Sequence, residues 1–153
     1  IVLAIDTKQE ADGEWYVYLN GGRIKTDARC IDWAKQAVNA GAGEILLTSM
    51  NHDGTKQGFA LDITAQLGET LPVPIIASGG GGNEQHLYDV FTKGKADAAL
   101  AAALNPPLVT VDAFPDSAPE NVGAVTVPGK DVLPLPSNNV AVLVNVLNTQ
   151  YIV

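Results

Sequence analysis

This sequence of 153 residues has little of several features that define common protein classes. Its one cysteine, Cys30, excludes an internal disulfide, and a lone thiol on a helix-like segment is expected to be a packing residue. Only 9 basic residues stand against 17 acidic ones, and the net charge of −8 argues against a nucleic-acid or anionic-membrane surface. We find no signal peptide and no apolar run long enough for a membrane helix. These absences favour a reducing compartment, and we expect a cytoplasmic location.

The chain is rich in apolar residues, which make up 46% of it, and this is enough to build a core. Its length suits one domain, or one domain with an appendage. It opens at Ile1 inside a strand-like run, with no initiator methionine, which we interpret as a piece excised from a longer chain.

Short apolar runs alternate with segments of helical periodicity over the first two thirds of the chain. Continuous apolar runs are typical of parallel strands buried on both faces. We expect strands at residues 1–5, 42–50, 73–77 and 96–103, and helices at 26–40, 59–67 and 83–93. Strand and helix in alternation predict βα units and a parallel sheet.

Turn and cap residues set the expected ends of these elements. Asp12-Gly13 precedes an aromatic run at 15–19, which predicts a small hairpin. Thr26 or Asp27 is the expected N-cap of the first helix. The second helix should end near Gly68, and Asn83 should cap the third.

The segment 75–82, Ile-Ile-Ala-Ser-Gly-Gly-Gly-Gly, joins a strand to a helix start through four glycines. Glycine lets backbone N–H groups approach a ligand closely, and a helix N-terminus is partly positive. This order of elements suits a phosphate. The alternative is a flexible turn between a strand and a helix.

Polar residues follow three of the expected strands at their C-terminal ends. They are Asp6, the loop 48–58, and the segment 78–82. In a (β/α) barrel these loops share one rim, and that rim carries the chemistry.

Five motifs follow one another along the first two thirds of the chain. They are Ile5-Asp6, Gly-Ala-Gly-Glu-Ile-Leu-Leu-Thr-Ser at 41–49, Asp-Gly-Thr-Lys-Gln-Gly at 53–58, Ile-Ala-Ser-Gly-Gly at 76–80, and Ala-Asp-Ala-Ala-Leu-Ala-Ala at 96–102. Together they resemble the cyclase subunit of imidazole glycerol phosphate synthase. The match is to strands five to eight of its (β/α)₈ barrel and covers residues 1–103. The resemblance therefore implies an α/β fold, half of a TIM-type barrel with about four parallel strands.

The resemblance also implies an activity. The family cyclises a phosphoribulosyl carboxamide ribotide with ammonia from a glutaminase subunit, a lyase-type step of histidine biosynthesis. It implies that Asp6 is one of two general acid/base aspartates, which suits a reaction that moves protons. It implies a substrate or phosphate contact at Thr48, Asp53, Gly54, Ser78, Gly79, Gly80, Gly81, Ala102 and Ala103, with no metal and no cofactor.

Read from the residues alone, some of these positions have plainer explanations. Asp6 could be an N-cap or a hairpin-loop carboxylate. Asp53 could make an Asx-turn ahead of Gly54. His52 and His86 have no motif partner, and we interpret both as surface residues.

The chain also departs from the family pattern. The other aspartate, the second phosphate site and most of the glutaminase interface belong to strands one to four, which this sequence does not contain. Asn51 stands where the family usually has Asp, and Ala102-Ala103 stands where it has Ala-Ser. The lost hydroxyl should weaken the phosphate site by roughly 1.5–3 kcal/mol.

Residues 104–153 match no family that we recognise. They hold seven of the nine prolines and five charged residues, so helices of useful length are excluded and a β-rich extension is predicted. The expected strands are 108–113, 122–127, 132–135 and 139–147. The extension could be a graft, a recombined segment or a sequence read out of frame.

Two functional hypotheses follow from this pattern. The first is a cyclase fragment or chimera that keeps one aspartate and one phosphate site and is inactive alone. The second is a non-catalytic half-barrel scaffold that associates with itself. In both, an open barrel edge has to be covered, so we expect the extension to add a strand and a homodimer to cover the rest.

Overall fold

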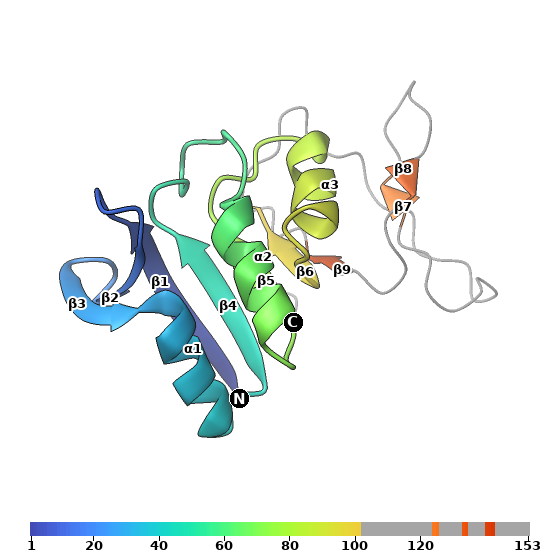
Figure 1. Ribbon diagram of the computed structural model, residues 1–153. Helices are drawn as coiled ribbons and strands as arrows, with labels where there is room; N and C mark the ends of the chain where they lie inside the picture. Colours follow the sequence, from blue (N-terminus) through green and yellow to red (C-terminus); the bar gives the residue numbers. More distant parts are fainter. Residues whose placement is uncertain (102–123, 126–132, 135–139, 143–153) are drawn as a thin grey trace.

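The computed structural model describes residues 1–101 together with 124–125, 133–134 and 140–142 (Figure 1). Four strands run parallel, and three helices connect them: β1 (Val2–Gln9), α1 (Cys30–Asn39), β4 (Glu44–Ser49), α2 (Leu61–Thr70), β5 (Ile75–Ser78), α3 (Glu84–Thr92) and β6 (Ala98–Leu100). This is the predicted α/β fold, consistent with part of a TIM-type barrel.

The sheet extends beyond the parallel strands on both sides. Over the described residues its order is β3-β2-β1-β4-β5-β6-β9. β2 (Trp15–Leu19) and β3 (Ile24–Arg29) are antiparallel additions, whereas β9 (Val140–Val142) pairs parallel with β6. At this edge, three residues of the extension pair with β6, and the rest of the strand expected at 139–147 lies outside the described residues.

Two further short strands come from the extension. β7 (Ala124–Val125) and β8 (Leu133–Pro134) pair antiparallel with each other. The strand expected at 108–113 lies outside the described residues, as do Ala102 and Ala103. Within the part of the chain that the structure describes, no helix is long and apolar enough to cross a membrane.

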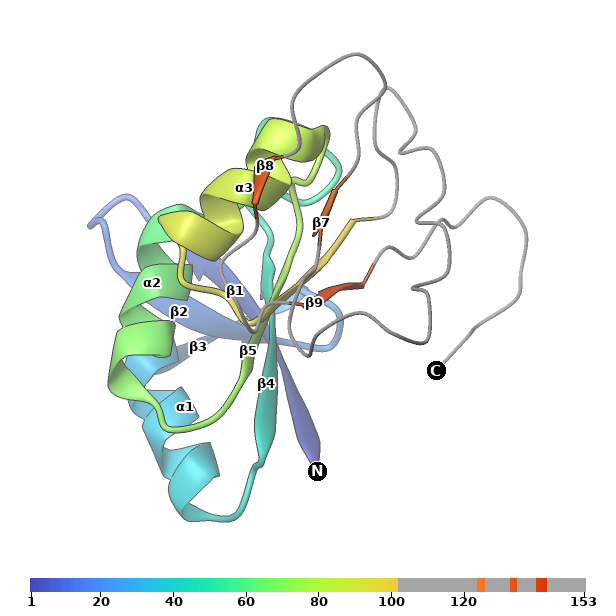
Figure 2. The same ribbon diagram turned by 90° about the vertical axis from the view of Figure 1, so that its right-hand side faces the viewer.

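The three helices lie on one side of the sheet (Figure 2), and the core forms there. Side chains alternate along each strand, so Ile5, Ile45, Leu47 and Ile75 point to the helices and are at most 1% exposed. Each such burial contributes about 1.5–3 kcal/mol. On the other face, the alternate residues of the same strands stay at least partly exposed, which corrects the expectation of strands buried on both faces.

The first helix starts later than predicted. Residues 26–29 belong to β3, because the Thr26 hydroxyl donates to the Val17 carbonyl (2.7 Å) and holds this segment against β2. Thr26 and Asp27 are therefore not helix caps. The N-cap is Arg29, and its side chain makes no capping hydrogen bond.

The hairpin after β1 is present as predicted, although β1 itself continues past Asp6 to Gln9. The hairpin is tied to the helix layer, since Trp15 Nε1 donates to a carboxylate oxygen of Asp62 on α2 (3.1 Å). Thr7 is fully buried beneath it and donates to the Tyr16 carbonyl (2.9 Å).

The second helix runs through Gly68 instead of ending there. A side chain at this position would come within 2.8 Å of the Lys95 carbonyl oxygen, so glycine serves close packing inside the helix. The third helix begins as predicted, with Asn83 Oδ1 accepting from the His86 N–H (2.9 Å).

Cys30 is a packing residue, as expected. It is fully buried at the start of α1, and burial raises the pKa of its thiol to about 11, although a hydrogen bond with Thr7 opposes the rise. Since the thiolate is favoured only above that pKa, the thiol form predominates at neutral pH.

We expect Cys30 to resist alkylation in the folded chain. Moving the pKa from the ordinary 9.0 to about 11 lowers the thiolate population about 100-fold, and burial restricts access further. Iodoacetamide labelling followed by mass spectrometry, at about pH 8 with and without denaturant, measures this. Equal labelling rates in the two conditions would contradict the buried position.

Candidate functional site

Three of the predicted site residues form one row across the sheet. Asp6 on β1 pairs in register with Thr48 on β4, and Thr48 pairs with Ser78 on β5. All three are half-buried on the face opposite the helices, at the C-terminal ends of their strands. Among residues 1–101, no group donates a hydrogen bond to the Asp6 carboxylate, so its oxygens are free to act on a ligand.

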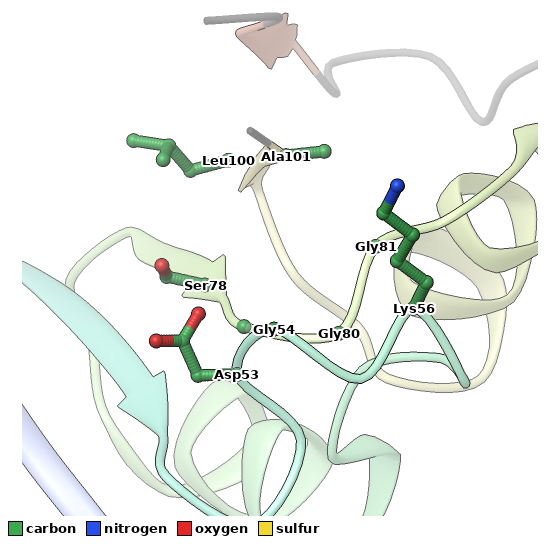
Figure 3. Close-up of a pocket in the computed structure, with 9 residues that line it drawn as sticks. Asp53, Gly54, Lys56, Ser78, Gly80, Gly81, Leu100 and Ala101 are labelled. Carbon is green, nitrogen blue, oxygen red and sulfur yellow. The ribbon is translucent and has the colours of Figure 1, made fainter. Parts of the chain in front are cut away.

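A hollow of about 140 Å³ lies at the end of this row, beside β5 and β6 (Figure 3). Its walls come from the loop after β4, the glycine segment after β5, and the end of β6. The lining residues are Asp53, Gly54, Lys56, Ser78, Gly79, Gly80, Gly81, Leu100 and Ala101. Six of the predicted site residues therefore meet in one place, whereas Asp6 and Thr48 lie along the row outside it.

Close backbone packing explains why glycines build this hollow. The Gly58 N–H donates to the Gly80 carbonyl (2.8 Å), which joins the two loops. Gly80 has φ +101°, and a Cβ there would lie 2.0 Å from the Gly58 carbonyl oxygen. A Cβ at Gly81 would lie 2.7 Å from the Phe59 ring. At Gly80 a side chain would require a shift of the backbone, and at Gly81 it would require the neighbouring side chains to move.

Three glycines that line the hollow, Gly54, Gly80 and Gly81, carry backbone N–H donors. No described residue accepts from the N–H groups of Gly54, Gly80 or Gly81, so a ligand can take these donors. Gly80 is buried, and a buried N–H without an acceptor costs free energy that an anion would recover. The N-terminus of α3 follows at once and adds a partial positive charge.

Lys56 is a site residue that sequence reasoning missed. It lies within the Asp-Gly-Thr-Lys-Gln-Gly motif, and its side chain extends past Gly81 in Figure 3. Its backbone has φ +57°, a conformation uncommon outside glycine. The signal available in the sequence was its charge in a loop of a chain with few cations. Leu100 and Ala101 gave no such signal because they read only as strand residues.

Charges divide the hollow into two ends. The carboxylate of Asp53 extends toward Ser78, whereas the ammonium of Lys56 lies near Gly81 (Figure 3). An anion is repelled by the first and attracted by the second. The favourable position for an anion is therefore the end formed by Gly80, Gly81 and Lys56.

The two histidines are not free surface residues, which corrects our interpretation. Both are half-buried and hydrogen-bonded in the rim. His52 Nδ1 lies 2.9 Å from the hydroxyl of Ser49 at the end of β4. His86 Nδ1 accepts from the Gly82 N–H (3.2 Å). The spacing of four residues between Gly82 and His86 was the signal for the second contact.

Asn51 fastens the end of β1 to the loop after β4. Its Oδ1 accepts from the Gln9 N–H (2.8 Å), and its Nδ2 donates to the Gln9 carbonyl (3.2 Å). A carboxylate could supply only the first of these bonds. The amide at this position therefore has a structural use in this chain.

We expect Gly80→Ala to unfold the rim at a cost of about 3 kcal/mol or more, because positive φ and the clash with Gly58 add together. Gly13→Ala is a matched control. Gly13 has φ +83°, but a Cβ there would meet nothing within 4 Å, so the expected cost is about 1 kcal/mol. Urea unfolding monitored by circular dichroism compares them. Equal costs for the two variants would contradict the interlocked loops.

Comparison with known proteins identifies the family. A family model described as "Histidine biosynthesis protein" matches residues 1–105. "Imidazole glycerol phosphate synthase subunit HisF" of Phocaeicola vulgatus is 58% identical over 103 residues, which are 67% of this chain and 41% of that protein. The subunit of the same name from Bacillus subtilis is 57% identical over 105 residues, 68% of this chain and 42% of that protein.

The chain thus spans about two fifths of the length of these curated relatives. The match includes every residue of the row and of the hollow. The chain belongs to the histidine biosynthesis protein family.

Proposed function

We propose that this chain carries one half of the active site of an imidazole glycerol phosphate synthase cyclase: a phosphate-binding site and one acid/base aspartate. The observation that carries the proposal is the registered row of Asp6, Thr48 and Ser78, which leads into a glycine-lined hollow. The relatives are named as imidazole glycerol phosphate synthase subunits. The reaction class, ammonia-dependent cyclisation of a phosphorylated substrate, is the one that the family resemblance implies.

The hollow is the proposed site for one substrate phosphate. Its support is the set of free N–H groups at Gly54, Gly80 and Gly81, the start of α3, and Lys56. These local donors matter because the whole chain carries a net charge of −8 and offers an anion no general attraction. Ala102 and Ala103 belong to the proposed site by the resemblance, and both lie outside the described residues.

Asp6 is the proposed general acid/base. It lies two strands from Ser78 in the register, which is roughly 10 Å at the usual spacing between strands. A substrate held by its phosphate in the hollow can therefore place its reacting atoms near Asp6, with Thr48 between them. A carboxylate at this distance moves the protons that ring closure requires.

The remaining parts of the proposed activity come from partners. A second carboxylate, a second phosphate site and ammonia from a glutaminase subunit complete the reaction of the resembled family. A second copy of this chain or a complementary half-barrel would cover the sheet face that carries Asp6.

A non-catalytic scaffold is the second candidate function. The observation that favours it is the same open face, where Ala4, Leu46 and Ile76 remain partly or fully exposed among the described residues. Apolar surface of this kind favours association. The scaffold would then use the rim only as packing between loops.

We expect inorganic phosphate to shift the amide resonances of Gly54, Gly80 and Gly81 in a ¹⁵N NMR titration, and to leave those of Gly13 and Gly41 unchanged. Lys56→Ala should weaken binding about twofold to fivefold, as for an exposed ion pair. Lys35→Ala on α1 is the matched control and should leave the affinity unchanged. No shift at millimolar phosphate would count against the site.

We expect these 153 residues alone to have negligible ammonia-dependent cyclase activity, because one aspartate cannot fill both proton-transfer roles. Adding the N-terminal part of a related synthase subunit tests complementation. In an active mixture, Asp6→Asn should lower kcat by about 100-fold or more. Asp27→Asn on β3 is the control and should retain activity. Turnover by the chain alone, or by the Asp6→Asn mixture, would contradict the assignment.

A further inference from the structure

His86 lies where the glycine segment turns into α3, and it is bonded to this segment and borders the loop after β4. Its backbone N–H donates to Asn83 Oδ1 (2.9 Å), which completes the helix cap. Its ring accepts from the Gly82 N–H through Nδ1 (3.2 Å). On the other side, a side chain at Gly58 would come within 3.6 Å of the ring, so the ring also borders the loop after β4.

The hydrogen bond from the Gly82 N–H determines which tautomer the neutral His86 ring adopts. Nδ1 accepts a hydrogen bond only without a proton, so the proton of neutral His86 is on Nε2. The approach of Asn83 Nδ2 to Nε2 at 3.4 Å is therefore a contact between two donors, and it adds no second hydrogen bond. The Gly82 bond is the polar contact that the ring contributes.

The hydrogen bond from Gly82 to His86 determines which backbone N–H groups of the glycine segment remain available to a ligand. The imidazole occupies the Gly82 N–H, while Gly80 and Gly81 keep theirs without an acceptor among the described residues. The backbone of Gly82 also lies close to the other loop, since a Cβ placed there would be 2.5 Å from the Lys56 carbonyl oxygen. The backbone at Gly82 is thus held between His86 and Lys56.

We propose that His86 is a positioning residue of the anion site: by accepting from Gly82, it sets the direction of the Gly80 and Gly81 N–H groups toward the ligand. His86 does not line the hollow and does not touch the ligand. The inference rests on the proposed function and adds to it a residue outside the binding surface.

Two substitutions separate the acceptor from the packing of the ring. In His86→Asn, the side-chain oxygen is attached to Cγ as Nδ1 is, so it keeps an acceptor for Gly82. His86→Leu keeps volume and removes the acceptor. Gln85→Leu is the matched control, since Gln85 lies next along α3 and bonds only to Asp89 among the described side chains.

The measurements are the Kd for inorganic phosphate, from the NMR titration, and hydrogen exchange at the Gly82 amide. We expect His86→Leu to weaken phosphate binding about threefold to tenfold, the range for one lost hydrogen bond. Gly82 should exchange faster in this variant. His86→Asn should restore both values to within about twofold of the parent, and Gln85→Leu should change neither.

Three outcomes would overturn the inference. Equal phosphate affinity in the parent and in His86→Leu would show that the acceptor is not needed. A His86→Asn variant as weak as His86→Leu would assign the effect to loss of the ring. If the parent itself binds no phosphate, the proposed function fails, and this inference fails with it. In the first two outcomes the parent still binds phosphate, so the proposed function stands.

Discussion

The hydrogen-bond register of β1, β4 and β5 is the constraint on which the site depends. Because side chains alternate along a strand, a slip of one residue would exchange the two faces of the sheet. Asp6 would then turn toward the helices, and Ile5 toward the open face. Burial of Ile5, Leu47 and Ile75 against the helices prevents this slip. The packing of apolar side chains on one face therefore determines that the polar side chains lie on the other face.

The site also shows how an acidic chain can attract an anion. A net charge of −8 gives no long-range attraction, and Asp53 adds a repulsive charge at one end of the hollow. Backbone N–H groups and one lysine act over short distances and need no long-range field to attract an anion. The position of the anion is then set by geometry between the two loops. Loss of the loop contact between Gly58 and Gly80 would remove this geometry without changing any charge.

Much of the fold could be predicted from local pattern. The apolar runs gave the four parallel strands, and Asn83 gave the start of α3, because strand periodicity and capping depend on neighbouring residues. The errors occurred at positions where tertiary contacts determine where a helix begins or ends. Thr26 looked like a cap but bonds to Val17 across a hairpin, and Gly68 looked like a helix end but packs against Lys95.

The candidate site likewise had residues that local pattern predicted and residues whose positions depend on tertiary contacts. Glycines and strand-end residues were predicted because their motif carries them, and the row of Asp6, Thr48 and Ser78 confirms that strand ends meet at one edge. Lys56, which lines the hollow, was missed, and so were the contacts of His86 with the rim. Their roles depend on how two loops approach each other, and spacing along the chain does not determine that approach. The roles of all these residues in binding and catalysis stay predictions.

Side chains of different size make the open face of the sheet uneven, and this shape limits which surfaces can pack against it. Two residues before the polar row on each strand, a second row of paired residues lies on the same face. In order across the sheet they are Ala4, Leu46, Ile76 and Ala98. Two large side chains in the centre, flanked by a methyl group on each side, make a ridge along β4 and β5. A covering surface needs a matching furrow, with small residues over the ridge and bulky ones at its flanks. A flat apolar sheet would leave voids above Ala4 and Ala98.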